Sequence, residues 1–228
     1  ESNNLALRGV CERAAEGRRR HLVSVKTEHK AVLDPLARLA RRGFEVTLLD
    51  VAGADSPTPG LLDLGRLVDS LGPETLLVSV MLANNEIGAI QPLTEIGKIC
   101  RERGILLHCD ATQAVGKLPV DVEQLHVDLL SLSAHKFYGP KGIGALYVRR
   151  RNPRVTLEPQ LDGGGQEGGR RSGTLNVPGI VGLAAALEIA RAEMAEETAR
   201  LIPLRQRLHT QLVEQLYGIS LHGPRFDR

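Results

Sequence analysis

Side chains that can carry chemistry follow four apolar segments of the sequence. They are His29 after segment 21–26, Asn84 and Asn85 after 75–83, Asp110 and Gln113 after 105–109, and Ser133, His135 and Lys136 after 127–132. A lysine becomes a nucleophile when burial or neighbouring cations lower its pKa, and it then forms a Schiff base with a carbonyl. A carboxylate that holds a proton on a pyridine nitrogen turns the ring into an electron sink. Lys136 and Asp110 together therefore indicate a site for pyridoxal 5′-phosphate, since a nicotinamide cofactor would explain neither residue.

The neighbouring residues suit the same cofactor. Ser133 and His135 offer hydroxyl and imidazole donors for a phosphate group. Gln113 lies three residues after Asp110, about one helical turn, so it is expected to meet the same ring. We also expect partial burial at a strand end to keep the Lys136 amine reactive.

Each of these features also has a purely structural interpretation. The alternatives are a surface or core histidine at His29, a turn at Asn84–Asn85, a helix N-cap at Asp110, a lysine stem lying along apolar surface at Lys136, and a flexible loop at 163–174. We favour the functional interpretation because the residues are expected to converge on one edge of a sheet.

The elements that would bring them together alternate along the chain. Predicted strands cover 21–29, 44–50, 75–83, 105–110 and 127–135, and predicted helices cover 31–43, 61–72, 92–104 and 177–216. This alternation is typical of βαβ units with a mostly parallel sheet, which binds ligands beyond the carboxyl ends of its strands. Segment 142–150 follows Lys136 too closely for a crossover helix, so we expect it to run antiparallel to its predecessor. Gly104 is a plausible C′ residue of the preceding helix.

Composition excludes several classes of function. The 228 residues are 42% hydrophobic and 25% charged, which is ordinary for a soluble globular protein. A net charge of +2 is too small to indicate a nucleic-acid or membrane partner, and no apolar run reaches the ~18 residues of a membrane span. The three cysteines have no metal-binding spacing, so we expect no metal site. They fit a reducing compartment, hence a cytoplasmic protein, or a mitochondrial or nuclear one in a eukaryote.

Five stretches carry a resemblance to a known family. They are TEHKAVLDPLARLARRGFEVTLL, NNEIGAIQPL, HCDATQAVGKLPVDV, VDLLSLSAHKFYGPKGIGALYVRR and GGGQEGGRRSGTLNVPGIVG. Together they resemble the class I cysteine desulfurases, pyridoxal-phosphate enzymes of aminotransferase class V that supply sulfur for iron–sulfur clusters. The resemblance implies an α/β fold of type I, like that of aspartate aminotransferase, with a mixed, mostly parallel sheet. It also implies a large cofactor-binding domain over 1–185, and a helix over 186–228 that leads into a smaller C-terminal domain.

The resemblance further implies a role for each candidate residue. Lys136 would attach pyridoxal 5′-phosphate, Asp110 would pair with the pyridine nitrogen, and Gln113 would bond the phenolic oxygen of the ring. His29 would stack on the ring and move protons, while Asn85 would contact substrate or cofactor. Ser133 and His135 would bind the phosphate, and Thr174 would reach the phosphate in the partner subunit of a homodimer. The implied reaction converts L-cysteine to L-alanine and leaves a persulfide for a sulfur-acceptor or iron–sulfur scaffold protein.

Some parts of the family pattern are absent from this sequence. The phosphate-binding Ala-Thr pair would precede Glu1, and the nucleophilic cysteine and the arginine that grips the substrate would lie beyond Arg228. We therefore expect a fragment that cannot complete turnover alone. None of Cys11, Cys100 and Cys109 is expected to substitute, and Cys109, next to Asp110 on a strand, is expected to face the opposite way.

Two alternatives stay open at this point. The first is another enzyme of the same fold, such as a selenocysteine lyase or an aminotransferase. The second is a non-catalytic remnant that binds partners or scaffolds assembly. The set Asp110, Gln113, Ser133, His135 and Lys136 argues against the second, because a remnant would have no reason to keep all five.

Overall fold

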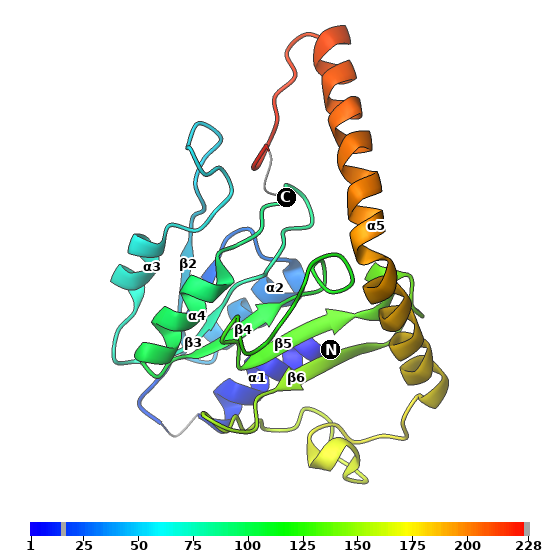
Figure 1. Ribbon diagram of the computed structural model, residues 1–228. Helices are drawn as coiled ribbons and strands as arrows, with labels where there is room; N and C mark the ends of the chain where they lie inside the picture. Colours follow the sequence, from blue (N-terminus) through cyan, green and yellow to red (C-terminus); the bar gives the residue numbers. More distant parts are fainter. Residues whose placement is uncertain (15–16, 226–228) are drawn as a thin grey trace.

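A single six-stranded sheet organises the chain (Figure 1). The computed structural model describes residues 1–14 and 17–225. The strands are β1 (His21–Val25), β2 (Glu45–Leu49), β3 (Thr75–Ser79), β4 (Leu106–Asp110), β5 (Leu129–Ser133) and β6 (Gly144–Val148). Their order across the sheet is β2-β1-β3-β4-β5-β6. The first five are parallel and β6 pairs antiparallel with β5. This confirms the predicted mixed, mostly parallel sheet and the antiparallel return after Lys136.

Helices cover both faces of the sheet. They are α1 (Ser2–Arg13), α2 (Lys30–Ala40), α3 (Leu64–Ser70), α4 (Leu93–Glu102) and α5 (Val177–Gln215), with short 3₁₀ turns η1 (Ala134–Phe137) and η2 (Gln166–Gly169). On one face, apolar side chains of α1 and α2 pack on alternate strand residues that include Leu22, Leu77 and Leu129. On the other face, α3 and α4 pack on Val78, Leu107 and Leu130. Residues that alternate along one strand therefore enter two separate cores, as the period of two requires.

Helix α5 packs against the rest of the chain over only part of its length. It begins beside η1 and the sheet, and its C-terminal half extends away from them (Figure 1). Its exposed apolar residues include Leu204, Leu208 and Val213. The predicted domain boundary at 185/186 falls inside this helix and stays a prediction. Among the described residues, no helix is long and apolar enough to cross a membrane.

Several predicted strands are longer than those observed. The segments 21–29, 75–83 and 127–135 yield only β1, β3 and β5. Beyond the end of β3 the chain still pairs with β4, because the amides of Val80 and Leu82 donate to the carbonyls of His108 and Asp110. The ladder between β3 and β1 ends at Ser79, so the regular strand ends there. Gly104 has φ +61° just after α4, which confirms it as the C′ residue.

Candidate active site

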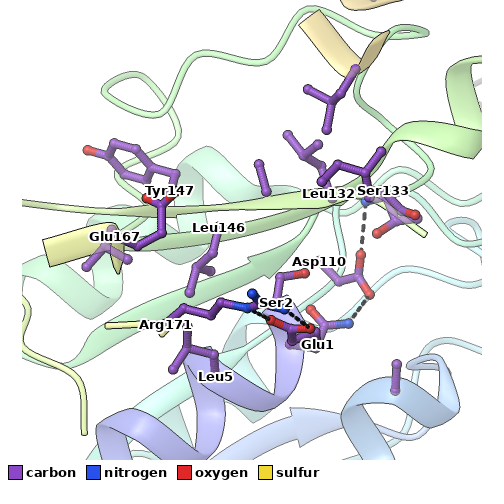
Figure 2. A pocket seen from close by; sticks show the side chains of 18 of the residues that line it. Glu1, Ser2, Leu5, Asp110, Leu132, Ser133, Leu146, Tyr147, Glu167 and Arg171 are labelled. Carbon is purple, nitrogen blue, oxygen red and sulfur yellow. Dashed lines mark hydrogen bonds and ion pairs between the residues drawn. The ribbon is translucent and has the colours of Figure 1, made fainter. Parts of the chain in front are cut away.

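One cavity of about 1460 Å³ includes the carboxyl ends of β1, β3, β4 and β5 and continues along β6 as far as Arg151. Its lining includes all eight residues of the predicted site: His29, Asn85, Asp110, Gln113, Ser133, His135, Lys136 and Thr174. Figure 2 shows part of this cavity, with Asp110 and Ser133 on its wall and the Glu1–Arg171 ion pair at its side. The convergence expected from the sequence is therefore present, while the role of each residue remains a prediction.

Asp110 ends β4 and is buried, with 5% of its surface exposed. Its Oδ1 accepts a hydrogen bond from the backbone amide of Thr112 at 2.9 Å. Its Oδ2 accepts one from Nδ2 of Asn3 at 2.7 Å. No ion pair reaches it from the part of the chain that the structure describes. The following residues form hydrogen-bonded turns rather than a helix, so the alternative of a helix N-cap at Asp110 is wrong, although the bond to Thr112 is of the kind that caps use.

Two titratable groups near Asp110, the Glu28 carboxyl and the His108 imidazole, have pKa values shifted toward their neutral forms. Burial raises the pKa of the Glu28 carboxyl well above its ordinary value, and Asp110 raises it further. Glu28 Oε1 accepts a hydrogen bond from the backbone of Met81, while its Oε2 has no hydrogen-bond partner among the described residues. Burial lowers the pKa of His108 to about 4. Hydroxyl groups of Ser79 and Ser131 lie 2.8 and 3.0 Å from the two ring nitrogens of this histidine.

The end of β5 and the turn after it also line the cavity. Ser133 Oγ lies 2.9 Å from Nδ1 of His135, so the hydroxyl and the imidazole are held together. Lys136 follows in η1, and Tyr138 then closes the turn in the left-handed region at φ 66°. Lys136 is exposed in this chain, so the expected partial burial is wrong. The physical reason is its place on a surface turn at the edge of the cavity, three residues beyond the end of β5.

Gln113 is oriented by a second lysine that sequence reasoning missed. Lys117 Nζ donates to Gln113 Oε1 at 2.9 Å, which leaves the amide nitrogen of Gln113 free for another acceptor. Partial burial, followed by the nearby charge of Lys136, lowers the pKa of Lys117. The spacing of four residues within ATQAVGK is the signal from which this contact was predictable.

His29 and the asparagine pair have distinct local roles. His29 caps α2, because its Nδ1 accepts a hydrogen bond from the amide of Ala31 at 3.0 Å. In the neutral ring this assigns the proton to Nε2. Asn84 does not line the cavity but holds its own loop, donating to the carbonyl of Thr27 and accepting from the amide of Glu86, both at 2.9 Å. This arrangement leaves Asn85 on the cavity wall.

Thr174 comes from the glycine-rich segment 163–174. That segment has internal order, because Gly173 donates to the Gln166 side chain at 2.9 Å and Gly165 donates to the Ser172 hydroxyl at 3.2 Å. Arg171 then pairs with Glu1 at 2.7 Å. These contacts give the segment internal structure, while the alternative of a flexible loop stays a prediction.

The three cysteines are free and buried. Cys109 packs with Val78 and Leu130 under α3 and α4, which confirms that it faces away from Asp110. Burial raises the pKa of the Cys11 and Cys100 thiols to about 12, and that of Cys109 well above its ordinary value. None of the three is a reactive thiolate at neutral pH, because the thiolate is the nucleophilic form.

Known proteins are similar in sequence to this chain over nearly its whole length. The family model described as Aminotransferase class-V matches residues 1–227. The cysteine desulfurase IscS of Anaeromyxobacter dehalogenans is 52% identical over 223 residues, which are 98% of this chain and 54% of the relative. The IscS of Aeromonas hydrophila is 57% identical over 209 residues, which are 91% of this chain and 50% of the relative. The chain therefore spans about half the length of the curated relatives it matches.

Solved structures share the fold. A NifS-like protein superposes with a TM-score of 0.87 at 42% identity, over 93% of this chain and 56% of the other. DndA from Streptomyces lividans gives 0.83 at 43% identity, over 93% and 59%. A structure of SspA in complex with cysteine gives 0.76 at 43%, over 82% and 52%. These matches confirm the predicted type I fold and its pyridoxal-phosphate dependence, and the chain belongs to the aminotransferase class-V family.

Proposed function

We propose that the protein is a pyridoxal-phosphate-dependent cysteine desulfurase, which takes L-cysteine to L-alanine and passes the sulfur on. The observation that carries the proposal is the cavity at the carboxyl ends of β1, β3, β4 and β5. A primary amine, a buried carboxylate, two amides, two imidazoles and the hydroxyl of Ser133 meet there.

The donor set fits pyridoxal 5′-phosphate. Asp110 is a buried carboxylate on the cavity wall, and no cation of the described chain pairs with it. A protonated pyridine nitrogen would supply that cation. The Ser133–His135 pair offers donors to a phosphate, and Lys136 offers the amine for covalent attachment. When bound, the cofactor supplies an electron sink for the substrate carbon.

The chain's own residues would then bind, orient and move protons. His29 is a proton carrier through Nε2, because the bond from Ala31 occupies its Nδ1. The Lys136 amine, when free, would carry protons in the same cavity. Gln113 presents its amide nitrogen to a ring oxygen because Lys117 engages its carbonyl.

L-cysteine is the proposed substrate because the similar relatives are named cysteine desulfurases and one similar structure holds cysteine. We do not assign the sulfur-accepting thiol to any of the three cysteines of this chain, since all are buried and their pKa values are raised. The onward acceptor is proposed to be an iron–sulfur scaffold or another sulfur-acceptor protein.

A homodimer is part of the proposal. Thr174 would serve the phosphate site of the partner subunit. Apolar residues just after it are exposed in the single chain, among them Leu175, Val177 and Val181. A dimer interface would cover such a cluster. Light scattering coupled to size exclusion tests the dimer, and a monomeric mass would contradict it.

The central test is covalent. The protein at its natural length is supplied with pyridoxal phosphate, reduced with borohydride and mapped by mass spectrometry. We expect a pyridoxyl adduct on Lys136, no adduct in Lys136→Ala, and an unchanged adduct in Lys141→Ala, which removes an exposed lysine of the same loop. A wild-type protein without an adduct at Lys136 would refute the assignment. Alanine and sulfide release from cysteine, compared with selenocysteine, then fixes the substrate.

A further inference from the structure

Asn3 links α1 to the end of β4 that lines the cavity. It lies in the first turn of α1, only 7% exposed, and it also lines the cavity. Its Nδ2 donates to Asp110 Oδ2 at 2.7 Å across 107 positions of sequence. In Figure 2, Asp110 lies close to Glu1 and Ser2 at the start of α1.

The contact to Asn3 is one of two that fix the plane of the Asp110 carboxylate. The second comes from the amide of Thr112 to Oδ1 at 2.9 Å. The two donors belong to separate segments, α1 and the turn after β4, and each holds a different oxygen. Rotation of the carboxylate about its last side-chain bond would break both contacts, so the pair of donors fixes a single orientation.

Asn3 performs this task without neutralising the carboxylate. An amide donates a hydrogen bond but carries no charge. The titratable neighbours Glu28 and His108 also favour their neutral forms, because burial raises the pKa of the first and lowers the pKa of the second. A lysine or arginine in place of Asn3 would supply a competing cation. The protein therefore orients the negative charge and leaves it available to a ligand in the cavity.

We propose that Asn3 is a positioning residue that holds the Asp110 carboxylate in the orientation that pairs with the ring nitrogen of pyridoxal phosphate. This inference rests on the proposed function, since it assigns that nitrogen to Asp110. Asn3 itself acts through Asp110 and takes no part in the bond changes of the substrate.

The test reads the ring nitrogen directly. The protein at its natural length is loaded with pyridoxal phosphate labelled with ¹⁵N in the ring, and the ¹⁵N resonance reports whether that nitrogen is protonated. The variants are Asn3→Ala, Asn3→Leu, which nearly keeps the size and adds no charge but removes the donor, and Asn3→Ser, which keeps a shorter donor. Asn4→Ala is the matched control, because the same residue type on the same helix has no hydrogen bond to Asp110.

We expect Asn3→Ala and Asn3→Leu to move the resonance toward the unprotonated position and to lower kcat for alanine formation by about 10- to 100-fold. This range is the effect on an equilibrium of one hydrogen bond to a charged group. Asn3→Ser should recover part of both signals, and Asn4→Ala should match wild type. If Asn3→Ala does not fold, the comparison of the resonance of Asn3→Leu with that of Asn3→Ser decides.

Two outcomes overturn the inference, and they are distinguishable. If the wild-type protein shows the Lys136 adduct while the Asn3 variants keep the wild-type resonance and a kcat within about twofold, Asn3 only anchors α1. A lower melting temperature with an unchanged resonance leads to the same conclusion. If the wild-type protein shows no adduct, the proposed function fails, and the role of Asn3 fails with it.

Discussion

Arg149 follows β6 and is expected to be the side chain whose loss most damages the sheet edge beside the site. It is 4% exposed, and its Nε lies 3.1 Å from Asp128 Oδ1. Its Nη1 donates to both oxygens of Glu123 at 2.7 and 2.8 Å. Its Nη2 donates to the carbonyls of Val122 and Val127 at 3.1 and 2.9 Å. One guanidinium thus ties β6 to the segment that leads into β5, the strand that ends at Ser133.

The loss of stability expected for Arg149→Met follows from the Asp128 carboxylate, which stays buried without its main cation. Asp128 is 4% exposed and keeps only its bond from the Leu107 amide at 3.0 Å and a distant cation, Arg101, at 3.8 Å. Removing one partner of a buried ion pair costs about 3–5 kcal/mol because the other charge stays uncompensated. The exposed Glu123 adds little, about 0–1 kcal/mol. We therefore expect a loss of about 3–5 kcal/mol in the free energy of unfolding.

Urea unfolding of the cofactor-saturated protein at its natural length measures this loss. Arg150→Met, at the exposed neighbouring position, is the control and should stay within about 0.5 kcal/mol of wild type. Asp128→Asn combined with Arg149→Met should recover more than half of the loss, because the unpaired charge is gone. Burial already raises the pKa of Asp128, so the cost of Arg149→Met alone should shrink as the pH falls and this carboxyl takes a proton. A loss under about 1 kcal/mol, or no recovery in the double variant, would refute the reasoning.

Three further predictions concern burial and close packing. Because the pKa of Glu28 is raised from 4.5, its contribution to stability is full below that pH and is lost as the pH rises toward the folded-state pKa. Glu28→Gln should therefore gain about 1.4 kcal/mol of relative stability per pH unit over that range in urea titrations, and a pH-independent difference would contradict this. Gly97→Ala should lower the free energy of unfolding by more than about 2 kcal/mol, since the new Cβ would lie against the Leu125 carbonyl. Gly72→Ala is the control, because its Cβ would meet no atom within 4 Å. Similar melting temperatures for the two variants would contradict the close packing at Gly97. At pH 8 iodoacetamide should label Cys11, Cys100 and Cys109 only after the protein is unfolded. Labelling of the native protein, detected by peptide mapping, would disprove their burial.

The sequence alone determined the order of the elements and the identity of the candidate site. Periods of two and 3.6 in the apolar residues are local signals, so the alternation of strands and helices was predictable without any contact map. Parallel strands end at one edge, and this rule alone placed Asp110, Ser133 and Lys136 on one cavity. The face of Cys109 followed from the same alternation.

Only the tertiary structure decided how the site residues are held. Asn3 and Asp110 are 107 positions apart, and no local pattern relates them until α1 packs at the end of β4. The neutral environment of Glu28 depends on burial beneath several elements, and the exposure of Lys136 depends on where η1 meets the surface. Patterns of residue type reveal which groups can do chemistry, because chemistry belongs to the side chain. Orientation, burial and charge depend on neighbours that are distant in sequence, so they appear only once the chain is folded.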